Sequence, residues 1–210
     1  MTKKTKNAII EAAIVLFNSK GFTGTSIRDI AQKANVNVSN ISYYFQNKRG
    51  LLEYCFTTYF EEYLQIIEES LYGTKESAPM RLRKVTENIL LFQCQNISLT
   101  RVVLREISID SQMVREIIST YLVKERYYFS KLFEEGIRSK EFHSFSINYM
   151  IIQYKSLLAM PFLNNYYLSE VLQVFTNESY FVKKYTKEIN AWIDGVILDQ
   201  SKPQLPMVIQ

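Results

Sequence analysis

Residues 25–52 constrain the fold most, because they encode two short helices separated by a tight turn. Ser26 can cap the first helix through its hydroxyl, and Asp29, three residues later, completes a capping box. Asn35 tolerates the left-handed backbone that ends many helices, and Asn37 is a favourable cap for the second helix. This spacing predicts a helix-turn-helix, the motif that places its second helix in the major groove of DNA.

The second helix of this motif is expected at about residues 38–44, with a mostly polar outer face. Its outward side chains are Val38, Ser39, Asn40, Ser42 and Tyr43. Val36 and Ile41 are expected to face the first helix instead. A polar face is unusual for a core helix, and it suits a helix that reads base edges.

Positive charge is concentrated around the motif. Residues 1–50 hold eight Lys or Arg against two acidic residues, a net charge of +6, whereas the other 160 residues hold 17 against 19, a net charge of −2. Each phosphate that a basic side chain neutralises releases counterions, which favours binding. An ordinary solvated surface is the alternative, but it does not explain why the charge and the motif coincide. The charge distribution therefore predicts a polyanion-binding head on a slightly acidic body.

The motif resembles the head of the TetR family of bacterial transcriptional regulators. The matching positions are Thr25, Ile30 to Ala34 (IAxxA), Val36, Ile41, Tyr43-Tyr44-Phe45, Asn47-Lys48 and Leu51-Leu52. The sequence departs from the usual pattern at Asn35, where Gly is common, at Asn37, where Ser is common, and at Ser42, where a Tyr is usual. The first two departures preserve the backbone chemistry, and the third removes one phosphate contact.

The resemblance implies an all-α protein that acts as a homodimer on a short palindromic site in double-stranded DNA, as a repressor. It implies a helix-turn-helix domain at residues 1–50, a helical dimerisation and regulatory domain at 51–200, and a loose tail at 201–210. In this family a long helix joins the two domains. Two late helices, at about 146–160 and 179–198, would form a four-helix bundle with the partner subunit; the alternative is that their apolar bands are monomer core.

The DNA-binding residues fall into two expected groups. Side chains that clamp the phosphate backbone orient the head and carry no sequence information; these are Thr25, Tyr43, Tyr44 and Lys48, with Ser42 beside them. Side chains that read bases are Arg28, toward a guanine, and Asn40, toward an adenine, together with Val38 and Ser39.

The body reads as nearly all helix, because Gly and Pro are few and no repeat or low-complexity tract interrupts it. Pro161 is expected to end one helix and separate it from another. The expected helices lie at about 48–71, 80–95, 99–109, 112–140, 146–160 and 162–174, and a last helix opens at Glu178 or Ser179 and ends near Leu198.

Two sets of body residues are candidates for function. A small apolar ligand could contact the aromatic residues Phe92, Tyr121, Tyr128, Phe129, Phe133 and Tyr154, although aromatic residues at helical spacing are more often core. The body also resembles TetR-type regulators of sporulating bacilli that control assembly of the cell-division Z ring. A cell-division protein partner would then dock on the charged residues Glu61, Arg101, Arg105, Arg115 and Glu116; ordinary surface ion pairs are the alternative.

The sequence gives no support for catalysis, a metal or a cofactor. His143 is the only histidine, and there is no Gly-rich phosphate loop or CxxC pair. Cys55 and Cys94 are expected to be reduced thiols, and no stretch reaches the roughly 20 apolar residues of a membrane span. We therefore expect a non-enzymatic cytoplasmic protein associated with the nucleoid.

Overall fold

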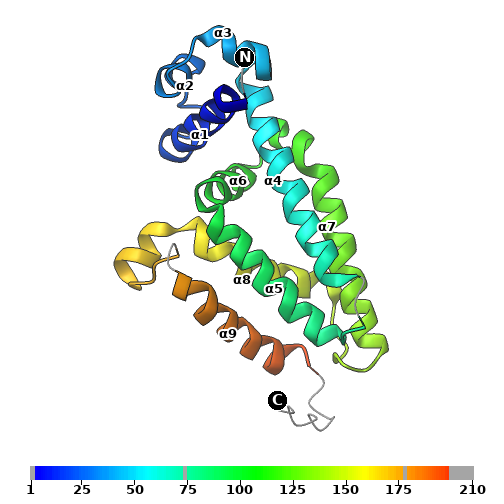
Figure 1. The fold of residues 1–210 in the computed structure, drawn as a ribbon. Helices are drawn as coiled ribbons and strands as arrows, with labels where there is room; N and C mark the ends of the chain where they lie inside the picture. The colour runs from blue at the N-terminus through cyan, green and yellow to red at the C-terminus, as the bar shows by residue number, and fades with distance from the viewer. Residues whose placement is uncertain (1–2, 73–74, 177–178, 199–210) are drawn as a thin grey trace.

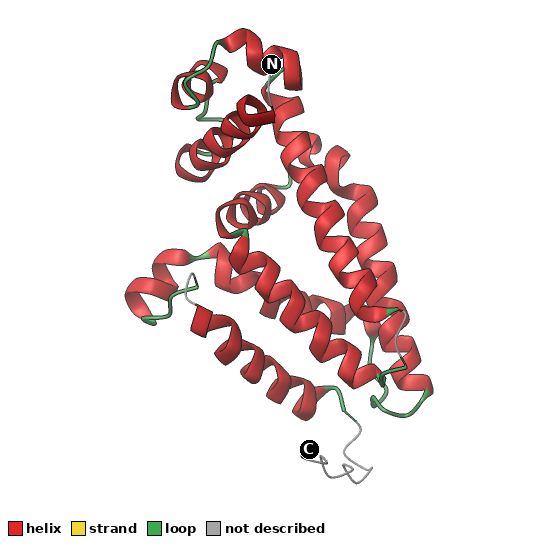
Figure 2. Cartoon of the chain, in the orientation of Figure 1, coloured by secondary structure: helices red, strands yellow, loops and turns green. Residues whose placement is uncertain are grey.

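The computed structural model describes residues 3–72, 75–176 and 179–198, and the protein is all-α there, without a strand (Figures 1 and 2). A single β-bridge joins Phe142 to Leu198. The helices are α1 (Lys3–Lys20), α2 (Ile27–Lys33), α3 (Val38–Phe45), α4 (Lys48–Leu71), α5 (Ala78–Gln95), α6 (Ile97–Ile109), α7 (Gln112–Arg138), α8 (Ile147–Leu163) and α9 (Ser179–Val196), with a π-helical turn η1 (Tyr167–Val171) before α9. The expected fold class is confirmed. Glu178 and the expected loose tail at 201–210 lie outside the described residues.

Helices α1, α2 and α3 form a small head at one end of the molecule, and α4 runs from this head along the whole body (Figure 1). Ile9, Phe17, Ile30 and Ile41 are fully buried and hold the three head helices together. In the body, α4 packs against α5 and α7, α5 packs against α9, and α6 lies directly under α1. The head therefore contacts the body through two helices, α4 and α6.

The caps expected in the motif are all present. The Asp29 amide donates to Ser26 Oγ at 3.1 Å, and the Ser26 amide donates to Asp29 Oδ2 at 3.0 Å. These hydrogen bonds lower the pKa of Asp29. Asn35 adopts φ +52°, and Asn37 Oδ1 accepts from the Ser39 amide at 2.9 Å. Short-range chemistry thus fixes both ends of the turn.

The expected helix break at Pro161 is wrong. Helix α8 continues through Pro161 to its last residue, and only the turn η1 forms where a further α-helix was expected. Proline lacks the N–H that would bond to the carbonyl of Leu157, four residues earlier. The Tyr185 hydroxyl of α9 donates to that carbonyl at 2.8 Å instead. A tertiary contact therefore replaces the lost helical hydrogen bond.

No described helix is both long enough and apolar enough to cross a membrane.

Candidate DNA-binding site and interior cavity

The outer face of α3 is the surface that the head offers to a partner. Val38, Ser39, Ser42 and Tyr43 are exposed there, and Tyr43 is 72% exposed. Arg28 of α2 is also exposed. Ser39 donates both its amide and its hydroxyl to Asn37 Oδ1, the hydroxyl at 3.0 Å, so the first turn of α3 is fixed by its own cap. The head thus presents polar groups on a rigid short helix, as readout of a groove requires.

Asn40 differs from its neighbours because it is half-buried. Its Oδ1 is buried and has no hydrogen-bond partner among the described residues. Reading an adenine, which offers one donor and one acceptor in the major groove, therefore requires the Asn40 side chain to rotate and expose its carboxamide. The base-reading role of Asn40 stays a prediction.

Two expected phosphate clamps have internal contacts. The Thr25 side chain is only 2% exposed, and its hydroxyl donates to the carbonyls of Gly21 at 2.8 Å and Leu16 at 3.2 Å. Lys48 Nζ donates to the carbonyls of Phe22 and Thr25, both at 2.8 Å. Thr25 thus braces the α1–α2 turn from inside and is not a surface clamp. Lys48 ties this turn to α4 and retains one of its three N–H donors.

Tyr44, the remaining expected clamp, is half-buried under Tyr43. Their ring centroids lie 5.1 Å apart in an edge-to-face arrangement. This packing supports the exposed Tyr43 ring from behind. Of the two tyrosines, Tyr43 therefore has the larger surface available to DNA.

The connection between α3 and α4 is strained, which sequence reasoning missed. Gln46 has φ +65° and ψ −56°, and the Asn47 amide donates to the Phe45 carbonyl at 2.7 Å. These values define the less stable form of the γ-turn. Asn47 then caps α4 by accepting from the Gly50 amide at 3.0 Å. The turn fixes the angle at which α3 leaves the rest of the head.

Gln46→Gly should relieve this strain. A non-glycine residue in such a region destabilises the folded state by about 1–3 kcal/mol. Glycine loses more backbone entropy on folding, and this loss offsets about 0.5–1 kcal/mol of the gain. We expect the free energy of unfolding to rise by about 1 kcal/mol in chemical denaturation. Gln32→Gly, at an exposed position inside α2, is the control and should lower stability by about 1 kcal/mol. A loss of stability in both variants would contradict the strain at Gln46.

The charged residues expected to contact a protein partner are mostly paired within the chain. Arg105 of α6 donates to the backbone carbonyls of Phe17 and, at 3.0 Å, Asn18 at the end of α1. Glu116 of α7 pairs with Arg49 of α4 at 2.7 Å. Arg105 therefore attaches the head to the body, and Glu116 ties α7 to the start of α4.

Arg101 and Arg115 also bond inside the chain. Arg101 donates to Asn165 and to Thr176, which fastens the segment between α8 and α9. Arg115 donates to the Asp110 carbonyl at 2.9 Å. Glu61 is the member of the set that lies exposed on α4 with no hydrogen bond or ion pair in the described part of the chain. Four of the five residues thus have structural contacts, which the sequence did not reveal.

The aromatic residues expected to line a ligand pocket are core residues. Phe92, Tyr128, Phe129, Phe133 and Tyr154 are buried. Burial raises the pKa of Tyr154, whose hydroxyl lies 2.9 Å from Thr86 Oγ1. Tyr121 is half-buried and stacks on Phe60, with ring centroids 5.4 Å apart. Their packing in the core favours the alternative that they are core residues, although Phe92 also lines a surface groove between α4 and α5.

A small, partly open cavity of about 50 Å³ lies between α4, α5, α6, α7 and α8. Its lining is Tyr59, Phe60, Tyr63, Gln93, Val103, Leu104, Ile107, Leu122, Glu125, Lys155, Leu158 and Ala159. None of the six expected aromatic residues is among them. One sequence signal could have indicated this site: Glu125 lies within the apolar band of α7. It was not among the expected site residues.

The acidic group of this cavity is already neutralised. Glu125 is 4% exposed, accepts from the Tyr63 hydroxyl at 2.7 Å and pairs with Lys155 Nζ. Burial, followed by the charge of Glu125, raises the pKa of Tyr63 well above its usual value. Tyr63 thus remains a hydrogen-bond donor at neutral pH.

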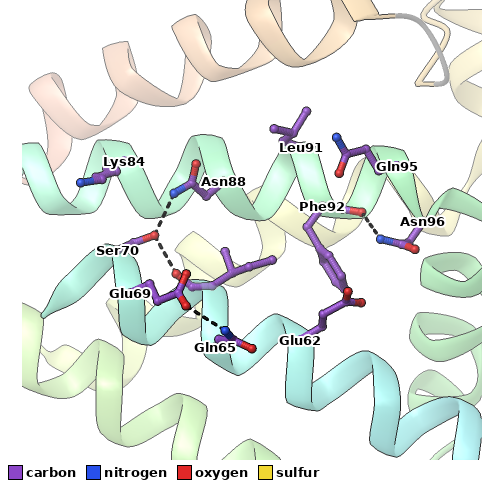
Figure 3. A pocket seen from close by; sticks show the side chains of 11 residues that line it. Glu62, Gln65, Glu69, Ser70, Lys84, Asn88, Leu91, Phe92, Gln95 and Asn96 are labelled. Atoms are coloured by element: carbon purple, nitrogen blue, oxygen red, sulfur yellow. Dashed lines mark hydrogen bonds between the residues drawn. The ribbon is translucent and has the colours of Figure 1, made fainter.

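A wider groove of about 620 Å³ runs between α4 and α5 on the surface (Figure 3). Two of its polar side chains bond to neighbours: Gln65 donates to Glu69 at 2.8 Å, and Asn88 donates to Ser70 at 2.9 Å. Phe92, one of the expected ligand contacts, is among its lining residues. We do not assign a ligand to this groove, because Gln65 and Asn88 already bond within the chain.

A basic helix-turn-helix head with an exposed polar helix, joined by α4 to a helical body, defines a DNA-binding transcriptional regulator. The model of the "Bacterial regulatory proteins, tetR family" matches residues 9–55. The "Probable HTH-type transcriptional regulator YttP" of Bacillus subtilis (strain 168) is 45% identical over 93% of this chain and 95% of its own length. The chain therefore belongs to the TetR family. The matched family and relatives are transcriptional regulators and not enzymes.

Two further comparisons cover the head and the fold. The "Biofilm operon icaADBC HTH-type negative transcriptional regulator IcaR" of Staphylococcus aureus (strain Newman) is 40% identical over 48 residues, 23% of this chain and 26% of its own length. The solved structure of AibR, in complex with isovaleryl coenzyme A and operator DNA, superposes with a TM-score of 0.73 at 14% identity, covering 90% of this chain and 97% of that one. The second likeness concerns the fold alone.

Proposed function

We propose that the protein is a homodimeric repressor that binds a short palindromic operator through α3 and acts at the nucleoid. The observation that carries this proposal is the exposed face of α3, from Val38 to Tyr43, in the part of the chain, residues 1–50, that has a net charge of +6. A helix of this kind enters the major groove, while basic and hydroxyl groups around it bind phosphates. The negative regulator IcaR, which is similar in the head, supports the repressor assignment.

Helix α8 supports the dimer. Tyr149, Ile152, Met160 and Leu163 are 42–69% exposed and repeat at helical spacing on one face of α8. An apolar stripe along a helix is the usual element of a subunit interface. A symmetric pair of such stripes would place two heads on one face of DNA, at half-sites separated by about one helical turn, roughly 34–36 Å.

The position of α6 supports control by a small ligand. Val103, Leu104 and Ile107 of α6 line the cavity, and Arg105 of the same helix holds the end of α1. A ligand that binds one arrangement of α6 better than another would shift the orientation of the head. We propose that this shift releases the operator.

Recovery and sequencing of genomic fragments bound by the purified protein tests the repressor proposal. Operator sites upstream of its own gene or of a nearby operon support it. Binding without sequence preference would contradict it. Palindromes at fixed chromosomal positions, with unchanged transcription nearby, would favour the alternative of a cell-division protein partner. Glu61, Arg115 and Glu116 are exposed on the body and would be its contacts.

Substitutions in the head should separate readout from anchoring. Arg28→Ala and Asn40→Ala should each relax preference at particular bases, by about 1–3 kcal/mol for each lost bidentate contact. Tyr43→Ala should weaken binding to specific and nonspecific DNA by the same factor. The measurement is a fluorescence anisotropy titration with operator and mutated sites. Tyr127→Ala, an exposed tyrosine of α7, is the control and should bind as the parent does; equal affinity of the Tyr43 variant would contradict the docking of α3.

A further inference from the structure

Lys6 differs from Lys3 and Lys4, the two other lysines at the start of α1. Lys3 and Lys4 are exposed, whereas Lys6 is half-buried. Lys6 precedes the fully buried Ile9 by three residues, and residues at this spacing lie on the same face of a helix. The Lys6 side chain therefore lies toward the inside of the head, while Lys3 and Lys4 remain open to solvent.

The Lys6 ammonium lies against two aromatic rings of the head. Its Nζ is 3.9 Å from the centroid of the Tyr54 ring and 5.7 Å from the centroid of the Phe45 ring. A cation within about 6 Å of a ring centroid is attracted by the negative face of the ring. Phe45 is the last residue of α3, and Tyr54 belongs to α4, which begins beside the start of α1 (Figure 1). One lysine thus joins α1 to both α3 and α4.

These contacts enclose the strained turn between α3 and α4. Gln46, with φ +65°, directly follows Phe45. A residue in such a conformation keeps it only when the surrounding structure holds it there. The rings of Phe45 and Tyr54, one before the turn and one after it, pack edge to face with centroids 5.4 Å apart. Because Lys6 contacts both rings, it helps to hold the turn.

A series of packed rings connects Lys6 to the outer face of α3. The Phe45 ring contacts the Tyr44 ring, with centroids 6.1 Å apart, and Tyr44 in turn supports the exposed Tyr43. Close-packed side chains transmit a displacement to their neighbours. A shift of Phe45 would therefore move Tyr43 and change the angle at which α3 leaves the head.

We propose that Lys6 is a positioning residue for α3 and that it does not bind a DNA phosphate. Through Phe45 and Tyr54 it fixes the orientation in which α3 meets the bases. The proposal rests on the proposed DNA-reading function of α3. The two roles of a lysine are separable, because a phosphate contact releases counterions and makes binding salt-dependent, whereas a cation–ring contact inside the protein does not.

A comparison of Lys6→Met with Lys4→Met tests this assignment, because both variants remove one charge from the start of α1. Anisotropy titrations over a series of salt concentrations use the full-length protein and two duplexes, one recovered from the genomic fragments and one with its base order scrambled. Lys6→Met should weaken binding to the recovered duplex about fivefold at every salt concentration, as the loss of a partly desolvated cation–ring contact predicts. Its binding to the scrambled duplex and its salt slope should match the parent.

The charge control should behave in the opposite way. Lys4→Met should weaken binding to both duplexes by the same factor and reduce the steepness of the salt slope by about 0.9, the value for one phosphate contact. Identical effects of Lys4→Met and Lys6→Met, in slope and in preference between the duplexes, would overturn the proposal.

A conservative variant and a double variant identify the contact itself. Lys6→Arg keeps a cation over the rings and should bind the recovered duplex within about twofold of the parent. Tyr54→Leu removes the nearer ring and should reproduce the loss seen in Lys6→Met. Combining the two substitutions should then add little, because both remove the same interaction. A second full loss in the combined variant would show that Lys6 acts elsewhere.

The two duplexes also distinguish failure of this inference from failure of the proposed function. Parent protein that binds both duplexes equally refutes the proposed operator recognition, and the positioning role with it. Parent protein that prefers the recovered duplex, together with a Lys6→Met variant that keeps the full preference, refutes the positioning role alone.

Discussion

Gly50→Ala is expected to unfold the α3–α4 connection and abolish specific DNA binding. A Cβ at Gly50 would lie 2.1 Å from the Phe45 carbonyl oxygen, and this atom belongs to the backbone of the γ-turn at Gln46. The backbone must move, because no side chain can rotate away. We expect a loss of about 3 kcal/mol in the free energy of unfolding and at least tenfold weaker operator binding.

Gly195→Ala is the matched control for this variant. Gly195 also lies in a helix, α9, but a Cβ there meets nothing within 4 Å. Alanine is the better helix former, so this change should stabilise the protein by up to about 1 kcal/mol and leave DNA binding unchanged. Denaturant melts and anisotropy titrations of both variants are the measurements. Parent-like binding by Gly50→Ala would contradict the proposed link between this turn and the angle of α3.

Lys155→Met is expected to cause the second large loss. It leaves the Glu125 carboxylate buried with one partner, the Tyr63 hydroxyl. Breaking a buried pair by removing one partner costs about 3–5 kcal/mol, and the 38% exposure of the Lys155 side chain places the expected value near the lower limit, about 3 kcal/mol. Chemical denaturation at neutral pH measures this loss.

Two further variants make this prediction specific to the buried pair. Adding Glu125→Gln to Lys155→Met removes the uncompensated charge and should restore most of the stability. Lys131→Met breaks a half-exposed pair with Glu134 and should change stability far less. Equal losses in the Lys131 and Lys155 variants would show that Glu125 is not desolvated.

The head was predictable from the sequence because its signals are local. Ser26, Asp29, Asn35 and Asn37 act on backbone groups within three residues of themselves. The strained turn at Gln46 was not predictable, because glutamine carries no preference for positive φ and the turn is imposed by the packing of α3 against α4.

The helices of the body were predictable from the sequence, but the position of its cavity was not. Periodicity places apolar residues inward, and it does not say whether the space between them is filled or empty. The expected aromatic residues fill that space, and the cavity lies beside Tyr59 of α4 and Gln93 of α5. The break expected at Pro161 failed for a similar reason, since Tyr185 donates the missing hydrogen bond to the carbonyl of Leu157, 28 residues earlier in the chain.

The contact between Arg105 and the end of α1 has a consequence for the evolution of such proteins. Arg105 binds backbone carbonyls, which every amino-acid sequence provides. The surface of α3 can therefore diverge, and a head can even be exchanged between paralogues. Arg105 of the body would still bond to the backbone at the end of α1 in the new head. Heads and bodies can then recombine independently, because the Arg105 contact does not depend on the side chains of the head.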